Sequence, residues 1–192
     1  NPTGRRIAKK DITRLLKSTE AVVLLDEAYI DFSGEDTSLK HAVTDYPNLL
    51  VARTFSKAYG MAGARLGYMF APEALAEPLN AVKTPYSVNA LSQALGLRAL
   101  EAIPSVRAHC EAVGERRETL KSELRALGFR VLDSEANFLF ILSEDDKLRE
   151  KLLKRDIAIR AYETTSPARY RISVGEEVEN QALIKALKEV LK

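Results

Sequence analysis

The chain has 192 residues, of which 46% are hydrophobic and 29% charged, and this composition excludes disordered, collagen-like and coiled-coil proteins. Lysine and arginine number 29 against 27 aspartates and glutamates, so the net charge is only +2. No bulk field therefore favours nucleic acid or an anionic membrane surface. Apolar runs such as Ala21 to Leu25 are much shorter than the roughly 20 residues of a membrane-spanning helix. We expect a soluble protein with no nucleic-acid or membrane partner.

The cysteine, the histidines and the first residues give further expectations. Cys110 is the single cysteine and cannot form a disulfide within the chain, which is typical of a reducing compartment, so the cytoplasm is the expected location. His41 and His109 have no cysteine or carboxylate cluster at the spacing of a zinc site, and we predict no metal. Residues 1–4 lack an initiator methionine and predict a turn, from which we expect a longer protein.

The first half of the chain predicts an α/β unit. Residues 11–18 have apolar side chains at helical spacing, and a short apolar run at 21–25 predicts a buried strand that ends before Asp26. Residues 48–53 and 66–70 predict two more strands, the second after a glycine-rich connection. Strands separated by helices and loops indicate a mostly parallel sheet, in which ligands bind beyond the carboxyl ends of the strands.

The second half predicts a smaller α+β unit. Apolar residues from Val106 onward follow helical spacing, and Gly128 ends this long amphipathic helix. The elements expected after it are strands at 137–142, 157–160 and 170–174, a helix at 147–154 and a final helix that carries Leu183 and Leu191. We place the boundary in a helical connection near Ile103 and Pro104, which gives domains of 1–103 and 104–192.

Lys57 lies in a segment whose residue types suit a ligand with both a phosphate and an aldehyde. The hydroxyls of Thr54 and Ser56 precede it, and a glycine-containing loop that ends at Arg65 follows it. A lysine amine can form a Schiff base, while hydroxyls, backbone N–H groups and a guanidinium can hold phosphate oxygens. Because a lone lysine is most often a solvated side chain, this interpretation depends on the residues around it.

Asp26 and Tyr29 provide the second part of the pattern. A carboxylate buried at the end of the first strand needs a cationic partner, and a protonated pyridine nitrogen would be one. Tyr29 would then bind the 3-oxygen of that ring, and Lys57 would hold the aldehyde carbon and move protons. Without Lys57, the pair Asp26 and Glu27 would be better interpreted as a helix cap or a surface turn.

Several segments occur in the order and approximate spacing of one enzyme family. They are NPTG at 1–4, DEAYIDF at 26–32, TFSK at 54–57 and the later Arg65, together with PYSVN at 85–89 and ANF at 136–138. In these segments the chain resembles the fold-type I pyridoxal-phosphate aminotransferases, and within them most closely the histidinol-phosphate aminotransferases. The resemblance covers the whole chain and implies an α/β fold, part of a large domain with a mostly parallel sheet, followed by a smaller α+β domain.

The resemblance implies a role for each residue that matches the family pattern. The implied catalytic residues are Lys57, which binds the aldehyde of pyridoxal 5'-phosphate, Asp26 at its ring nitrogen and Tyr29 at its 3-oxygen. The other residues implied to contact the cofactor are Asn1 at the 3-oxygen and Thr54, Ser56 and Arg65 at the phosphate. The implied substrate-binding residues are Arg160, Arg171 and Asn137.

Two arginines on neighbouring strands suit a phosphate dianion, because each planar guanidinium can donate two parallel hydrogen bonds. The alternative for Arg160 and Arg171 is that each lies at a strand edge and faces water. Asn137 either faces the substrate or caps a strand, and the sequence favours neither role.

The function that the resemblance implies is transamination of histidinol phosphate with 2-oxoglutarate in histidine biosynthesis, by a homodimer. The family also has a preceding part, with the helix start that binds the cofactor phosphate and an aromatic residue on the ring, and these residues do not include it. We therefore interpret the chain as the carboxyl-terminal portion of such an enzyme and do not expect it alone to turn over substrate. Alternatives left open are an aromatic amino-acid aminotransferase, a phosphothreonine-type decarboxylase, and an inert fragment or interaction module.

Overall fold

The computed structural model describes residues 1–34, 37–162 and 167–191, which belong to two compact units. The amino-terminal unit is Ile7–Cys110, and the carboxyl-terminal unit combines Asn1–Arg6 with Glu111–Lys192. This grouping differs from the predicted domains, since the division falls inside a helix and the first residues join the second unit. The first residues join the second unit because the amide of Glu135 donates a hydrogen bond to the carbonyl of Gly4 at 2.8 Å.

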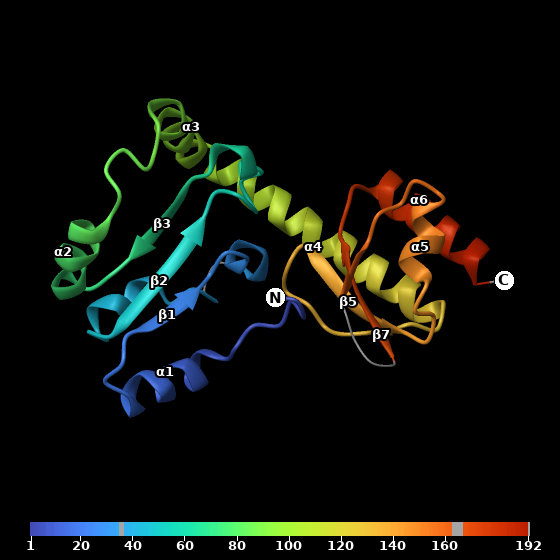
Figure 1. The fold of residues 1–192 in the computed structure, drawn as a ribbon, viewed down its shortest axis with the longest axis horizontal. Coiled ribbons are helices and arrows are strands. Elements are labelled where there is room, and N and C mark those ends of the chain that lie inside the picture. Colours follow the sequence, from blue (N-terminus) through green and yellow to red (C-terminus); the bar gives the residue numbers. More distant parts are fainter. Residues whose placement is uncertain (35–36, 163–166, 192) are drawn as a thin grey trace. The chain divides into compact units, whose positions relative to one another are not determined.

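The amino-terminal unit contains a mixed sheet in which β2 lies between β1 and β3 (Figure 1). Its elements are α1 (Lys9–Ser18), β1 (Val23–Asp26), short 3-10 helices at Ile30–Ser33, Lys40–Thr44 and Ala62–Ala64, β2 (Leu49–Thr54), β3 (Gly67–Phe70), α2 (Glu73–Val82), α3 (Ala90–Glu101) and the start of α4 (Ile103–Ala126). β1 and β2 are parallel, as expected, but β3 is antiparallel to β2. The compact loop before β3 returns the chain beside β2 without a crossover helix, so the antiparallel direction results.

The core of this unit lies between α1 and one face of the sheet. Ile12 and Leu16 of α1 are buried with Leu49 and Val51 of β2. The helix is amphipathic, and its apolar face packs against the face of β2 that Leu49 and Val51 share. Asn48 fastens this packing at the start of β2, because its side-chain amide donates to the carbonyls of Leu16, Thr19 and Ala21 at 3.2, 2.9 and 3.2 Å.

The carboxyl-terminal unit contains an antiparallel sheet in the order β4-β5-β7-β6. Its two central strands, β5 and β7, are labelled in Figure 1. Its elements are the remainder of α4, β4 (Arg130–Val131), β5 (Phe138–Ser143), α5 (Leu148–Leu153), β6 (Arg160–Tyr162), β7 (Ala168–Ser173) and α6 (Glu177–Val190). The predicted strand at 157–160 overlaps β6 only at Arg160. The long helix begins at Ile103, earlier than the apolar pattern indicated, because Pro104 is tolerated in a first turn where its missing N–H has no helical partner.

Alternation along β5 and β7 divides the sheet into two faces. Leu139, Ile141, Tyr170 and Ile172 point to one face and are at most 2% exposed. The helices contribute side chains that are equally buried, namely Leu120, Leu124, Leu148, Leu152 and Leu187. Arg171 lies between Tyr170 and Ile172, so its side chain points to the opposite face of the sheet. The α/β class predicted for the chain is confirmed by this architecture.

Across the described ranges we find no helix with both the length and the apolarity to cross a membrane. The same residues contain no group of three or more histidine, cysteine, aspartate or glutamate side chains that could hold a metal ion.

Candidate active site

Lys57 and Tyr29 meet although they follow different strands. Tyr29 follows β1 and Lys57 follows β2, and these strands are parallel neighbours whose carboxyl ends lie side by side. The ammonium nitrogen of Lys57 lies 5.3 Å from the centre of the Tyr29 ring, within the range of a cation–π contact. Lys57 is exposed and Tyr29 is half-buried. The structure thus brings together two residues that the sequence analysis assigned to one site.

Asp26 ends β1 at the same edge of the sheet, but its environment differs from the expected one. We predicted a buried carboxylate here, and in the structure Asp26 is exposed. Asp26 lies two positions after Leu24 on the strand, so the two side chains point to the same face of the sheet. Leu24 is 58% exposed, which shows that this face is open. The Asp26 carboxylate accepts a hydrogen bond from the amide of Ala28 at 2.9 Å, which fixes the turn that leads to Tyr29.

The buried carboxylate at this strand end belongs to Glu27, which is 5% exposed. Its oxygens accept hydrogen bonds from the Ser38 hydroxyl at 2.6 Å and from the Leu39 amide at 2.7 Å. One of them also lies 3.9 Å from Nε of Arg53, and Arg53 forms an ion pair with Asp31. The sequence analysis missed this group. The available signal was Arg53 itself. It lies two positions after Val51 on β2, so its side chain points to the same inner face, where a cation needs acidic partners.

Thr54 and Ser56 form the turn that connects β2 to Lys57. The Thr54 hydroxyl accepts from the Ser56 amide at 3.0 Å and donates to the carbonyl of Leu66 at 3.3 Å. The amide of Phe55 also donates to Leu66, at 3.1 Å. Both Thr54 contacts are internal to the loop, so this side chain shapes the turn, whereas no hydrogen bond of the Ser56 hydroxyl to another described residue is present.

Arg65 ends the loop in the left-handed region, with φ +51°. This conformation costs a residue with a Cβ roughly 1–2 kcal/mol, and such residues persist where their surroundings hold them. One guanidinium nitrogen donates to the carbonyl of Ala62 at 3.1 Å. The start of α3 fixes the carbonyl of Ala64, directly before Arg65, because the buried Ser92 hydroxyl donates to it at 2.7 Å. Asn89 caps this helix by accepting from the Ser92 amide at 2.9 Å.

Aromatic rings pack beneath this loop. The Phe55 ring centre lies 4.8 Å from that of Tyr59 and 5.4 Å from that of Tyr68. Burial raises the pKa of the Tyr59 phenol, and the phenol of Tyr68 and the carboxylate of Asp31 raise it further. Burial also raises the pKa of Tyr68. Both phenols therefore stay neutral well above physiological pH and pack against Phe55.

The carboxyl-terminal unit carries two predicted site residues, Arg160 on β6 and Arg171 on β7. They are register partners in the antiparallel pair of β6 and β7, so both side chains point to the same face. The Arg171 guanidinium carbon lies 4.9 Å from the Phe138 ring centre, and that of Arg160 lies 5.9 Å from the Tyr162 ring centre. In the part of the chain that the structure describes, neither guanidinium forms an ion pair with a carboxylate. Two guanidinium groups on one face of a strand pair could hold an anion between them.

Asn1 lies in the carboxyl-terminal unit, beside Arg171. Its side-chain oxygen accepts a hydrogen bond from a guanidinium nitrogen of Arg171 at 3.0 Å. Sequence reasoning assigned Asn1 to the cofactor and Arg171 to the substrate, and did not anticipate that the two side chains contact each other. The bond orients the guanidinium without neutralising it, because an amide carries no charge.

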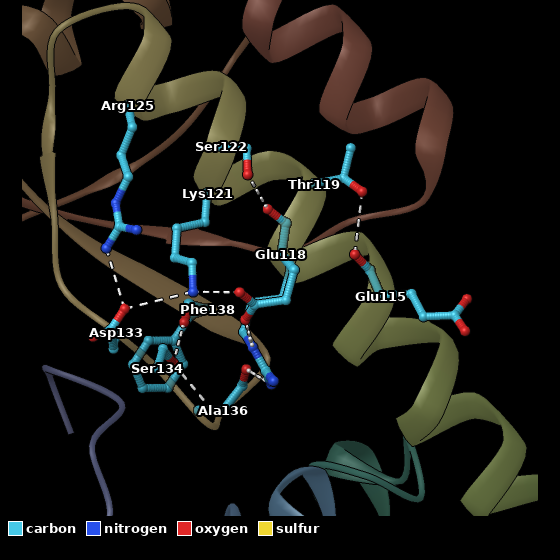
Figure 2. A network of polar contacts seen from close by, with 11 residues as sticks. Glu115, Glu118, Thr119, Lys121, Ser122, Arg125, Asp133, Ser134, Ala136 and Phe138 are labelled. Carbon is cyan, nitrogen blue, oxygen red and sulfur yellow. Dashed lines mark hydrogen bonds and ion pairs between the residues drawn. The ribbon is translucent and has the colours of Figure 1, made fainter.

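Asn137 lies in the turn between β4 and β5. A network of polar contacts holds this turn through Ser134, Ala136 and Phe138 (Figure 2). The backbone oxygen of Asn137 accepts from the amide of Val174 at 2.9 Å. On either side of it, the Ser134 hydroxyl accepts from the amide of Ala136 at 3.1 Å and donates to the carbonyl of Phe138 at 2.7 Å. The backbone of Asn137 is thus fixed within the unit, and both roles considered for its side chain remain predictions.

Side chains of helix α4 also bind this turn (Figure 2). Arg117 donates to the carbonyl of Ala136 at 3.1 Å, and Arg125 binds Asp133 at 3.1 Å. Lys121 lies between Glu118 and Asp133 and forms ion pairs with both. The hydrogen bond from Lys121 lowers the pKa of Glu118, and the hydrogen bond from Arg125 lowers that of Asp133. Both acids therefore stay ionised at neutral pH.

The chain matches one protein family, described as aminotransferase class I and II, over residues 1–187. The chain belongs to this family. The match confirms the resemblance stated from the sequence, and the family depends on pyridoxal phosphate. The chain is 37% identical to histidinol-phosphate aminotransferase from Flavobacterium johnsoniae, over 98% of this chain and 55% of that protein. It is also 37% identical to the enzyme of the same name from Thermotoga maritima, over 100% of this chain and 56% of that protein.

Solved structures of aminotransferases have the same fold. The histidinol-phosphate aminotransferase from Clostridium acetobutylicum superposes with a TM-score of 0.92 at 27% identity, covering 100% of this chain and 61% of that one. The enzyme from Sinorhizobium meliloti in complex with pyridoxal-5'-phosphate gives 0.90 at 25% identity, covering 100% and 55%. L-threonine-O-3-phosphate decarboxylase from Porphyromonas gingivalis gives 0.83 at 26% identity, covering 100% and 62%. The chain thus spans about half the length of the curated relatives it matches, 55% of the first.

Proposed function

We propose that the chain is part of a pyridoxal-phosphate-dependent aminotransferase that converts histidinol phosphate, with 2-oxoglutarate as the amino acceptor. The observation that carries the proposal is the meeting of Lys57 and Tyr29 beyond the carboxyl ends of β1 and β2, 5.3 Å apart. Family membership and relatives named histidinol-phosphate aminotransferase at 37% identity support it. The proposal includes a homodimer in the cytoplasm, as expected for a biosynthetic enzyme of this family.

The side chains at this edge of the sheet fit pyridoxal 5'-phosphate by their chemistry. Lys57 has an exposed amine for the aldehyde carbon, and the exposed Asp26 carboxylate can pair with a protonated ring nitrogen. Tyr29 can donate to the 3-oxygen. Ser56 and Arg65 supply a hydroxyl and a guanidinium for the phosphate. Thr54 acts on the phosphate through the shape of its turn, because its hydroxyl already bonds Leu66 and Ser56.

When bound, pyridoxal phosphate supplies an electron sink for negative charge at the substrate Cα. The Lys57 amine would remove the proton from Cα of the amino donor and, in the reverse half-reaction, would deliver a proton to Cα of the new amino compound, so it would have to stay near the reacting carbon while free of its own bond to the cofactor. Asp26 favours the protonated ring nitrogen through its opposite charge. The Tyr29 hydroxyl holds the ring in one orientation through its hydrogen bond to the 3-oxygen.

Arg160 and Arg171 are proposed to bind the phosphate of the substrate. Their guanidinium groups share one face of the β6–β7 pair, and Asn1 orients that of Arg171. A phosphate dianion between them would remove the repulsion that two cations have at one register position. Asn137 is proposed as a further substrate contact, since the turn that carries it is fixed to the same unit.

A phosphothreonine-type decarboxylase is the second candidate. The arginine pair would recognise the phosphate of either substrate and does not distinguish an imidazole from a methyl group. The structural similarity to the Porphyromonas gingivalis decarboxylase supports this alternative. An aromatic amino-acid aminotransferase is less well supported, because its substrate offers the two arginines a single carboxylate and no dianionic phosphate.

The first test is chemical trapping of Lys57 in the 192-residue chain. Incubation with pyridoxal phosphate and reduction with borohydride should attach the cofactor at Lys57, as measured by peptide mass spectrometry. Lys83, an exposed lysine after α2, is the matched control, and Lys83→Ala should leave the modification unchanged. Preferential labelling of other lysines, with Lys57 unmodified, would refute the proposal.

The second test concerns the substrate and uses the complete polypeptide that contains these residues. Its kcat/KM should be highest for histidinol phosphate when histidinol phosphate, phosphothreonine and phenylalanine are compared. Release of carbon dioxide from phosphothreonine would select the decarboxylase. Absence of turnover for all three, with Lys57 labelled, would favour an inert cofactor-binding module.

A further inference from the structure

We propose that Arg53 is a positioning residue that, through Asp31 and Glu27, fixes Tyr29 against Lys57. The inference rests on the proposed function for its catalytic meaning. Its structural content, the distance between the Tyr29 ring and the Lys57 amine, can be measured without cofactor.

Arg53 is an almost buried cation at the end of β2. Its side chain is 10% exposed, that of Glu27 is 3% exposed and that of Asp31 is 23% exposed. Burying a guanidinium is costly unless acidic partners and hydrogen bonds compensate. The compensation here comes from one short segment, residues 27–31, so the position of that segment is coupled to the position of β2.

The contacts of Arg53 bracket Tyr29 in the sequence. One guanidinium nitrogen forms an ion pair with Asp31, two residues after Tyr29, and Nε lies 3.9 Å from Glu27, two residues before it. The backbone between them is a tight turn, with the Ile30 amide donating to the Glu27 carbonyl at 3.1 Å. The Asp31 end of the turn that carries Tyr29 is therefore bonded to the Arg53 guanidinium, and the Glu27 end faces the same guanidinium at the distance of an ion pair without a hydrogen bond.

Arg53 also precedes the segment that carries the other member of the pair. Thr54 follows it directly, and the turn of Thr54 and Ser56 leads to Lys57. A rigid link at Arg53 thus sets the separation of the Tyr29 ring from the Lys57 amine, 5.3 Å in the structure. Glu27 is held independently by Ser38 and Leu39, so it supplies a fixed point and not a mobile counter-ion. Displacement of a catalytic group by about 1 Å can lower a rate on the order of 100-fold.

The test compares Arg53→Gln with Arg98→Gln in the 192-residue chain. Arg98 belongs to the same unit and also pairs with a glutamate, Glu101, but its side chain is 80% exposed. The first readout is the NMR chemical shift of the Lys57 ε-CH2 group in the chain labelled with ¹³C-lysine, assigned with Lys57→Arg. The Tyr29 ring current displaces this signal, and Tyr29→Leu gives the undisplaced position. Arg53→Gln should move the signal toward that position, and Arg98→Gln should leave it unchanged.

The second readout is the rate of borohydride-trapped labelling of Lys57 by pyridoxal phosphate. Arg53→Gln should lower this rate about 10-fold, while Arg98→Gln should keep the parent rate. If Lys57 of the parent chain is not labelled but its NMR signal still depends on Arg53, the proposed function fails and the structural link stands. If the signal and the labelling rate of Arg53→Gln equal those of Arg98→Gln, the positioning role is overturned.

A second variant separates positioning from loss of the fold. Asp31→Asn keeps the volume of the side chain and removes the charge that pairs with Arg53. It should shift the Lys57 signal in the same direction as Arg53→Gln, while the circular dichroism of the chain stays that of the parent. A folded Asp31→Asn chain with the parent signal and labelling rate would contradict the proposal even if Arg53→Gln does not fold.

Discussion

Arg160 and Arg171 lie directly opposite each other in the antiparallel pair of β6 and β7, with both side chains on the same face of the sheet. Like charges at directly opposite positions destabilise a strand pair by roughly 0.2–1 kcal/mol. Each guanidinium rests over an aromatic ring, Phe138 or Tyr162, which offsets part of this repulsion. The arrangement stores positive charge that a bound anion would neutralise.

The first prediction is that phosphate stabilises the carboxyl-terminal unit through this pair. The melting temperature of the chain should be higher in phosphate than in chloride at equal ionic strength, because phosphate binds only the folded unit. Arg171→Gln should remove the difference. Arg149→Gln, on the exposed side of α5, is the control and should retain it. Equal phosphate effects in the two variants would exclude the pair as the anion site.

The second prediction concerns Asn48 at the start of β2. Asn48→Asp should destabilise the amino-terminal unit by about 2–3 kcal/mol, because the carboxylate cannot donate to the three carbonyls that the amide now satisfies. Urea unfolding followed by circular dichroism measures the change. Asn80→Asp on the exposed surface of α2 is the matched control and should change stability by only a few tenths of a kcal/mol. Equal effects would show that the amide bonds contribute nothing specific.

The third prediction concerns Gly4, whose φ is +75°. A Cβ at this position would lie 2.1 Å from the Ser134 hydroxyl oxygen and 2.8 Å from the Ser134 Cβ. Gly4→Ala should therefore detach residues 1–6 at a cost of roughly 1–3 kcal/mol. The measurement is hydrogen exchange at the Glu135 amide, which donates to the Gly4 carbonyl. Gly128→Ala is the control, because Gly128 has a φ of +88° but no atom within 4 Å of the added Cβ. In the Gly128→Ala variant the Glu135 amide should keep the parent exchange rate.

The fourth prediction is a pH dependence that originates at Asp145. Partial burial opposes its ionisation, but hydrogen bonds from Lys151, at 2.6 Å, and from the Lys147 amide, at 3.0 Å, together hold its pKa below the ordinary value of 3.8. Because the folded-state pKa is the lower one, the ionised group stabilises the fold above pH 3.8, and this contribution is lost as the pH falls through the folded-state pKa.

Asp145→Asn should therefore reduce stability by roughly 1 kcal/mol at pH 7 and by less near pH 3, as measured by urea unfolding at both values. Asp146→Asn, at the exposed neighbouring position, is the control and should show no such difference. A constant effect of Asp145→Asn across this range would exclude the ion pair as its cause.

Local patterns predicted the elements of the fold well where one face of an element is buried. The α1 residues Ile12 and Leu16 and the β2 residues Leu49 and Val51 follow the expected periodicities and are buried. Strand β6 was misplaced because residues 157–159 have the apolar character of a strand, whereas Arg160 and Tyr162 owe their strand pairing to β7. Pairing with a distant strand is a tertiary effect that local periodicity does not contain.

The candidate site was predicted in its residue types but not in its supporting contacts. The proximity of Tyr29 and Lys57 follows from parallel strands with adjacent carboxyl ends, which the sequence indicated. The buried acid was assigned to Asp26 and is Glu27, because the alternation that exposes Leu24 and Asp26 turns the next side chain inward, toward Arg53. The bond between Asn1 and Arg171 was not predictable, since it joins positions at opposite ends of the chain.

That bond, with the one from Glu135 to Gly4, makes the carboxyl-terminal unit discontinuous in sequence. Protein engineers who excise residues 111–192 as a single piece would remove the hydrogen-bond partner of Arg171 and uncover the side chain of Phe138 on which its guanidinium rests. A faithful minimal version needs the opening hexapeptide joined to it by a short linker, in the manner of a circular permutant.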